Sequence, residues 1–109
     1  MSSVFDAKAQ LLRVYVPEGR MKDGQGAAEW IVCRACEHGL AGASVLRGIG
    51  GYYMNDPVVA PEFFNLRMSH PVIVEMVDQP EKIEEFSGFL KKEMSGLLLC
   101  RNEVDICVS

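Results

Sequence analysis

The feature that most limits the fold of this chain is a repeated order of strand, helix and strand, in two halves of similar size. Four segments are short, apolar and rich in β-forming residue types, which predicts strands at 11–16, 42–49, 72–77 and 97–108. Right-handed crossovers would place both intervening helices on one face of a four-stranded antiparallel sheet. We therefore predict an α+β, ferredoxin-like βαββαβ fold, with residues 1–109 forming a single domain.

Each predicted helix has one apolar stripe at helical spacing. The first helix covers 27–37, and its stripe consists of Ala28, Ile31, Val32 and Ala35. The second begins at Pro80 and stops at Gly96, with a stripe of Ile83, Phe86, Leu90 and Met94. Asp23 and Asp78 are the predicted N-caps, and Gly39 is the predicted residue that ends the first helix.

Three segments lie outside these elements. Residues 1–9 are expected to be a loose leader, and 17–26 a loop rich in glycine. Residues 50–69 are expected to form a long flexible loop, because no strong period runs through them and they contain Pro57, Pro61 and an Asn-Asp pair. A loop of this length in a small domain is usually functional or mobile. We also expect the last strand to be broken near Arg101 and Asn102.

The two faces of the predicted sheet differ in character. One alternating set is fully apolar and should carry the helices: Leu12, Val14, Val16, Val72, Val74 and Met76. The other set adds one charge per strand: Leu11, Arg13, Tyr15, Ile73, Glu75 and Val77. Such a face suits a subunit interface in which Arg13 and Glu75 pair across neighbouring strands. The alternative is a monomer whose mildly apolar sheet faces water, as many antiparallel sheets do.

Composition narrows the class of protein. The chain has 11 basic and 15 acidic residues and a formal charge of −4, which argues against nucleic-acid binding. No apolar run approaches the roughly 18 residues of a membrane span. Residues 1–10 lack the apolar core of a secretory signal, so we expect a cytoplasmic protein with reduced thiols.

Cys33 and Cys36 form a Cys-x-x-Cys pair, which suggests a second function from another class. A metal-binding or thiol redox protein could use these thiols, with Glu29 or Glu37 on the same helix. The opposing interpretation is that they are two ordinary thiols on a helix. Cys33 lies nearly opposite the apolar stripe and should be exposed. No catalytic motif occurs, so we do not expect an enzyme.

The segment 39–51, with the sequence GLAGASVLRGIGG, resembles the helix-to-strand-to-loop signature of the PII-like signalling proteins. It is most similar to the small, uncharacterised branch of that superfamily. Three further stretches support the resemblance, at 12–16, 71–78 and 80–83, so that it covers about residues 10–108. It implies a homotrimer with the sheets facing inward and clefts between subunits that bind small effectors. The loop at 50–69 would then touch a partner protein, such as a transporter or an enzyme.

The resemblance also implies a ligand site at the end of the second strand. Ser44 matches a hydroxyl residue that contacts adenine, so the implied effector is an adenine nucleotide such as AMP, ADP or ATP. Amides freed by a Gly-x-Gly stretch can form an anion-binding concavity. The implied ligand-binding residues are Ser44, Arg47, Gly48, Ile49, Gly50 and Gly51. The opposing interpretation is that these glycines only make the exit from the strand.

Several residues depart from the PII pattern. Tyr52 and Tyr53, which we assign to the partner loop, replace a Gln and a Lys. The connection at 92–97 lacks a Gly-Lys-Ile motif, and the C-terminal arginines of the cleft have no counterparts. A smaller or less charged ligand than a triphosphate is therefore easier to accommodate.

Overall fold

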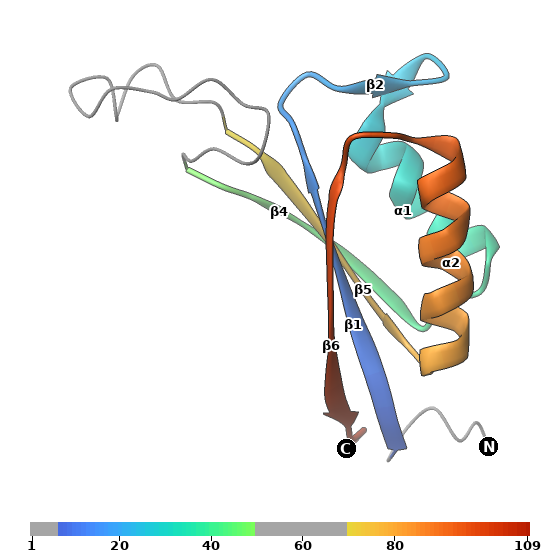
Figure 1. The fold of residues 1–109 in the computed structure, drawn as a ribbon. Helices are drawn as coiled ribbons and strands as arrows, with labels where there is room; N and C mark the ends of the chain where they lie inside the picture. Colours follow the sequence, from blue (N-terminus) through green and yellow to red (C-terminus); the bar gives the residue numbers. More distant parts are fainter. Residues whose placement is uncertain (1–6, 50–69) are drawn as a thin grey trace.

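Two helices cover one face of a four-stranded antiparallel sheet (Figure 1). This computed structural model describes residues 7–49 and 70–109. In chain order the elements are β1 (Ala7–Val16), β2 (Met21–Lys22), β3 (Gln25–Gly26), α1 (Ala27–Glu37), β4 (Gly42–Arg47), β5 (Val72–Asp78), α2 (Pro80–Glu93) and β6 (Leu98–Ile106). The sheet order is β4-β5-β1-β6, so each helix connects two strands that are not neighbours. The predicted ferredoxin-like α+β fold is confirmed.

The core lies between the helices and the sheet. The strands contribute buried side chains at alternate positions, as predicted: Leu12, Val14, Val16, Val74 and Met76. The whole predicted stripe of α2 is buried as well. In α1 the buried stripe is turned toward Trp30, and Ala28 and Val32 are only half-buried. The Trp30 ring is drawn inward because it stacks on Phe89 of α2, with ring centroids 5.9 Å apart.

The end of α1 follows the sequence prediction. Gly39 has a φ of +76°, a left-handed conformation that side chains with a Cβ rarely adopt. The Gly39 N–H donates to the Cys36 carbonyl, and the Leu40 N–H donates to the Ala35 carbonyl. This pair of hydrogen bonds is the Schellman motif, which satisfies the last carbonyls of the helix.

Three predicted boundaries are wrong. β1 begins at Ala7, so residues 7–9 belong to the sheet and not to a leader, and Ala9 is fully buried. β4 ends at Arg47 rather than 49. β6 is continuous through Arg101 and Asn102, which pair with Leu12 and Leu11 of β1. Polar residues do not interrupt this strand because it lies at the edge of the sheet, where their side chains reach water.

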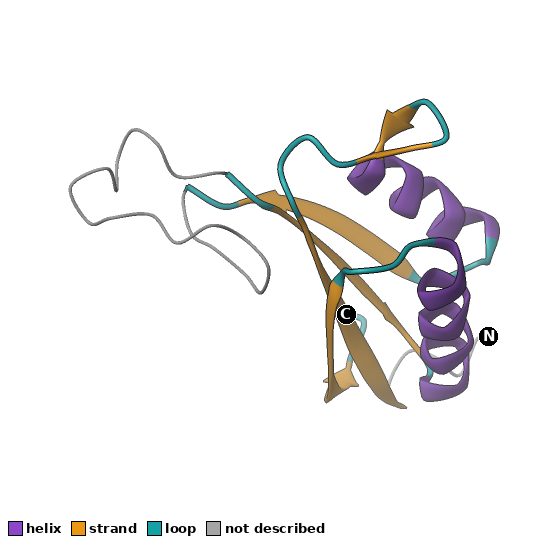
Figure 2. Ribbon diagram, turned by 45° about the horizontal axis from the view of Figure 1, so that its top comes forward, coloured by secondary structure: helices purple, strands orange, loops and turns teal. Residues whose placement is uncertain are grey.

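The predicted loop at 17–26 contains a small hairpin, formed by β2 and β3 (Figure 2). Asp23 and Gly24 form its two-residue turn, with φ values of +52° and +85°. An Asp-Gly pair is a strong signal for such a turn. The prediction that Asp23 caps α1 is therefore wrong. Gly26 is the N-cap, and it makes no side-chain cap hydrogen bond.

The hairpin holds the C-terminal end of α2. The Lys22 ammonium donates to the Glu93 carbonyl at 3.0 Å, and the Arg20 guanidinium donates to the Ser95 carbonyl at 3.0 Å. Lys22 also lies 5.4 Å from the centroid of the Trp30 ring. The last carbonyls of a helix have no partners inside the helix, so Lys22 supplies a donor to one of them from a segment distant in sequence. Arg20 binds the chain just beyond the helix.

Candidate functional site

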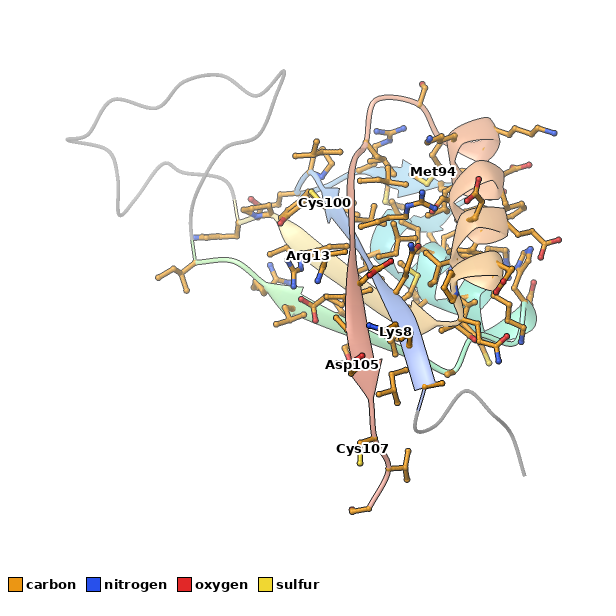
Figure 3. All side chains as sticks on the ribbon, turned by 60° about the horizontal axis from the view of Figure 1, so that its bottom comes forward. Lys8, Arg13, Met94, Cys100, Asp105 and Cys107 are labelled. Atoms are coloured by element: carbon orange, nitrogen blue, oxygen red, sulfur yellow. The ribbon has the colours of Figure 1, made fainter. Side chains whose placement is uncertain are left out.

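The face of the sheet away from the helices, here called the open face, has a polar row at its centre. Ser44, Glu75, Arg13 and Cys100 are register neighbours across all four strands. The Arg13 Nε donates to Glu75 Oε2 at 2.8 Å, so the predicted ion pair forms within one subunit. Figure 3 shows Arg13 and Cys100 on the side opposite Met94, which packs beneath the helices.

The carboxylate of Glu75 keeps the Arg13 guanidinium charged. Its hydrogen bond raises the pKa of Arg13 above the ordinary value. A raised pKa in the folded state gives a contribution to stability that is complete below the ordinary pKa and is lost only as pH rises through the raised value. The charge on Arg13, and the contribution of this charge to stability, are therefore unchanged across physiological pH.

Apolar side chains flank the polar row on both sides. One cross-strand row contains Leu46, Ile73, Tyr15 and Leu98, and another pairs Val77 with Leu11. Val104 and Ile106 extend the apolar surface along β6. Leu46 is 44% exposed, and the other aliphatic members are half-buried in the single chain. Apolar surface therefore lies on both sides of the polar row, and exposed apolar surface of this kind favours association.

The exit from β4 is built on a close approach of two chain segments. The Gly48 N–H donates to the Pro71 carbonyl at 2.8 Å, which extends the pairing of β4 with β5 by one residue. A Cβ at Gly48 would lie 3.4 Å from both the Pro71 oxygen and its Cγ. These distances are at the near limit of ordinary van der Waals contact, so a side chain here would touch Pro71 without a clash. Ile49, the next residue, is 94% exposed.

The structure brings together only some of the predicted ligand-binding residues. Ser44 is exposed on the open face, opposite Glu75. Arg47 is opposite Val72 and lies on the other face of β4, so it does not share a surface with Ser44. Gly50, Gly51, Tyr52 and Tyr53 lie outside the described residues, as does the rest of the predicted loop up to residue 69.

A buried carboxylate fixes the start of β4. Asp78 is 3% exposed, and its Oδ2 accepts the Ala41 N–H at 2.8 Å. Its Oδ1 accepts the Gln79 N–H, and Lys82 Nζ lies 3.9 Å from Oδ2. The N-cap of α2 is Gln79, so the prediction of Asp78 as N-cap is wrong by one residue. The carboxylate instead joins the α1–β4 connection to the end of β5.

The cysteine pair lies on the exposed side of α1. Cys33 and Cys36 are both exposed free thiols, as expected for Cys33. Cys36 borders a cavity of about 210 Å³ between α1 and β4, whose other lining residues are apolar: Val32, Ala35, Leu40 and Ala43. Within 7–49 and 70–109, no group of three or more His, Cys, Asp or Glu residues is arranged to hold a metal ion. In the same part of the chain, no helix is long and apolar enough to cross a membrane.

Sequence reasoning missed the contribution of β6 to the open face. The alternation of Leu98, Cys100, Asn102, Val104 and Ile106 was the available signal. It places apolar residues on the open face and Leu99, Arg101, Glu103 and Asp105 on the helix side. This division makes the open face larger and more apolar than the two central strands alone indicate.

The topology and the open sheet face define the class of this protein as the PII-like fold. The chain matches a protein from Thermus thermophilus that is described as PII-like and signalling, with a TM-score of 0.63 and 10% identity, over 93% of this chain and 91% of that one. A looser match is the CPII protein of Thiomonas intermedia K12, bound to ADP and bicarbonate, with a TM-score of 0.49 and 10% identity, over 90% of this chain and 89% of that one.

Sequence comparison gives the family itself. Residues 9–106 match the DUF190 family, described as an uncharacterized ACR, and the chain belongs to this family. A UPF0166 protein of Aquifex aeolicus is 37% identical over 91 residues, which cover 84% of this chain and 87% of that protein. The predicted PII-like fold is thus confirmed by the structural match, and the family is DUF190.

Proposed function

We propose that this DUF190 protein is a regulatory, non-enzymatic PII-like protein of the cytoplasm that assembles as a homotrimer. The open face would form the contact between subunits, and the clefts between them would bind a small effector. The observation that carries the proposal is the apolar surface around the Arg13–Glu75 pair, which neither α1 nor α2 covers. Burying apolar area yields about 25 cal/mol per Å², so association of this face is favourable.

The Arg13–Glu75 pair favours an interface for a second reason. Removing an isolated charge from water is costly, but a paired and hydrogen-bonded charge costs much less. Because Arg13 already bonds Glu75 within its own chain, the two charges can be covered by another subunit without being left unpaired. The charged centre of the open face is thus compatible with burial.

The effector we propose is an adenine nucleotide, AMP, ADP or ATP. Ser44 would contact the base, and the backbone amides of residues 49–51 would approach the phosphates, because the Gly48 N–H already donates to the Pro71 carbonyl. Arg47 would act from a different surface of the same strand. The proposal draws on the PII-like fold and on the exposure of Ser44 and Ile49. Residues 50–69, including Tyr52 and Tyr53, would contact the regulated protein, such as a transporter or an enzyme.

Calorimetric titration of the purified protein with AMP, ADP and ATP tests the effector. We expect saturable binding of at least one of them, weakened about fivefold in Ser44→Ala, since one net hydrogen bond is worth about 1 kcal/mol. Ser109→Ala removes the same hydroxyl at the exposed C-terminal residue and should leave the affinity unchanged. Absence of binding by all three nucleotides would refute the nucleotide proposal. Sedimentation velocity of an open-face variant, Ile73→Glu, tests the trimer separately.

A further inference from the structure

A groove between α2 and β6 lies on the helix side of the sheet, away from the open face. It encloses about 280 Å³ and is lined by Glu84, Ser87, Gly88, Lys91, Leu99 and Arg101. The four residues from α2 are spaced as i, i+3, i+4 and i+7, so they form one flank of that helix. Pockets for drug-sized ligands usually enclose about 300–1,000 Å³, so this groove suits a smaller molecule.

The wall of the groove contains a hydroxyl group without a partner. Ser87 is 6% exposed, and its Oγ is buried with no hydrogen bond to any described residue. Most buried polar side-chain atoms in proteins have a partner, and leaving one without costs about 1–3 kcal/mol. The Ser87 hydroxyl is therefore an unused donor buried in the wall of the groove.

Gly88 leaves the same part of the groove open. Glycine inside a helix costs about 1 kcal/mol relative to alanine. A Cβ built on Gly88 meets no atom within 4 Å, and the φ of Gly88 is not positive. Neither packing nor backbone conformation in this chain requires glycine at this position. What glycine provides here is free space next to Ser87.

Two cations and one carboxylate surround this space. Arg101 Nη1 lies 3.8 Å from Glu84 Oε1, which is an ion pair but longer than a hydrogen bond. Lys91 has no ion pair with the described residues. The groove thus has an excess of one positive charge and several unused N–H donors. A group that only accepts hydrogen bonds and is negatively charged complements this set.

We propose that the groove between α2 and β6 binds a small oxyanion, a phosphate or carboxylate group, through Ser87, Lys91 and Arg101. The Ser87 hydroxyl and the two cations donate to its oxygens, and Gly88 provides room for it. Ser44 lies on the opposite face of the sheet, so this site is separate from the proposed effector site and does not depend on it.

The test is a titration of the full chain with inorganic phosphate and, separately, with acetate, followed by amide chemical shifts in ¹H–¹⁵N spectra. We expect saturable shifts at residues 84–91 and 99–101 with at least one of the two anions, and the more effective anion identifies the chemistry. Lys91→Gln should weaken this binding about tenfold, as expected for a hydrogen bond to a charged group. Lys92→Gln removes the same charge one residue away, outside the groove, and should have little effect.

Gly88→Ala is the sharper variant, because a structural defect cannot explain its expected result. The melting temperature of this variant should be no lower than that of the unmodified protein, while its affinity for the anion should fall tenfold or more. Sodium chloride at equal ionic strength should not reproduce the shifts. If neither anion gives saturable shifts there, or if the shifts persist equally in Gly88→Ala and Lys91→Gln, the oxyanion site does not exist.

Discussion

At the scale of single residues, the positions with the clearest roles are those where the chain makes contacts that its local sequence does not reveal. Asp78 follows a strand and precedes a proline, a context that predicts a helix cap. In the fold its carboxylate instead bonds the Ala41 N–H, 37 residues away in sequence. Gly48 is similar, since its N–H donates to the Pro71 carbonyl, 23 residues away in sequence. Such partners depend on the tertiary fold and cannot be predicted from local sequence.

Replacement of Asp78 by alanine should destabilise the protein by about 1–3 kcal/mol. The Ala41 and Gln79 N–H groups would lose the charged acceptor that the buried Asp78 supplies, and a hydrogen bond to a charged group is worth about 1.5–3 kcal/mol. Urea unfolding followed by circular dichroism measures the loss. Asp105→Ala is the matched control, because Asp105 is 87% exposed and its ion pair with Lys8 spans 3.9 Å, so its removal should change stability by less than about 0.5 kcal/mol. Equal losses in both variants would contradict the role of Asp78.

At the scale of elements, helical periodicity predicted both helices, and short apolar runs of β-forming residues predicted all four long strands. α1 matches its predicted bounds, and the stripe of α2 is buried throughout, because both sets of residues must cover the same sheet face. The hairpin at Met21–Gly26 was missed, although its Asp-Gly turn is visible in the sequence. Two strands of two residues are too short for alternation to appear, so turn chemistry was the available signal.

Lys22→Ala tests whether the hairpin supports the end of α2. The variant removes the donor to the Glu93 carbonyl and the cation beside Trp30, so we expect a loss of about 1–2 kcal/mol. Lys8→Ala removes the same side chain from an exposed position on β1, where 79% of it is in contact with solvent, and should cost much less. Thermal unfolding compares the two variants. A melting temperature equal to that of Lys8→Ala would show that α2 does not need this contact.

At the scale of the whole molecule, one face of the sheet is covered by helices and the other is not (Figure 1). Sequence predicted this asymmetry and the Arg13–Glu75 pair, because a two-residue period fixes which side chains share a face. The same period places Arg47 on the other face of β4 from Ser44. Within one chain, a single surface of the sheet therefore does not present both Ser44 and Arg47.

Ile73→Glu is the variant that tests the assembly. Ile73 lies in the apolar row between Leu46 and Tyr15, so a carboxylate there would be buried without a partner in a trimer but would face water in a monomer. Sedimentation velocity at micromolar concentration should show the unmodified protein at three times the mass of the 12.1 kDa chain and the variant mainly as the single chain.

Met21→Glu provides the control for that experiment. Met21 is 59% exposed on the hairpin, on the helix side of the molecule, so the same change of charge there should leave the trimer intact. If the unmodified protein sediments with the mass of a single chain, the proposed trimer does not form, and the clefts between subunits do not exist. A trimer that persists in Ile73→Glu would show that the subunits meet through some surface other than the open face.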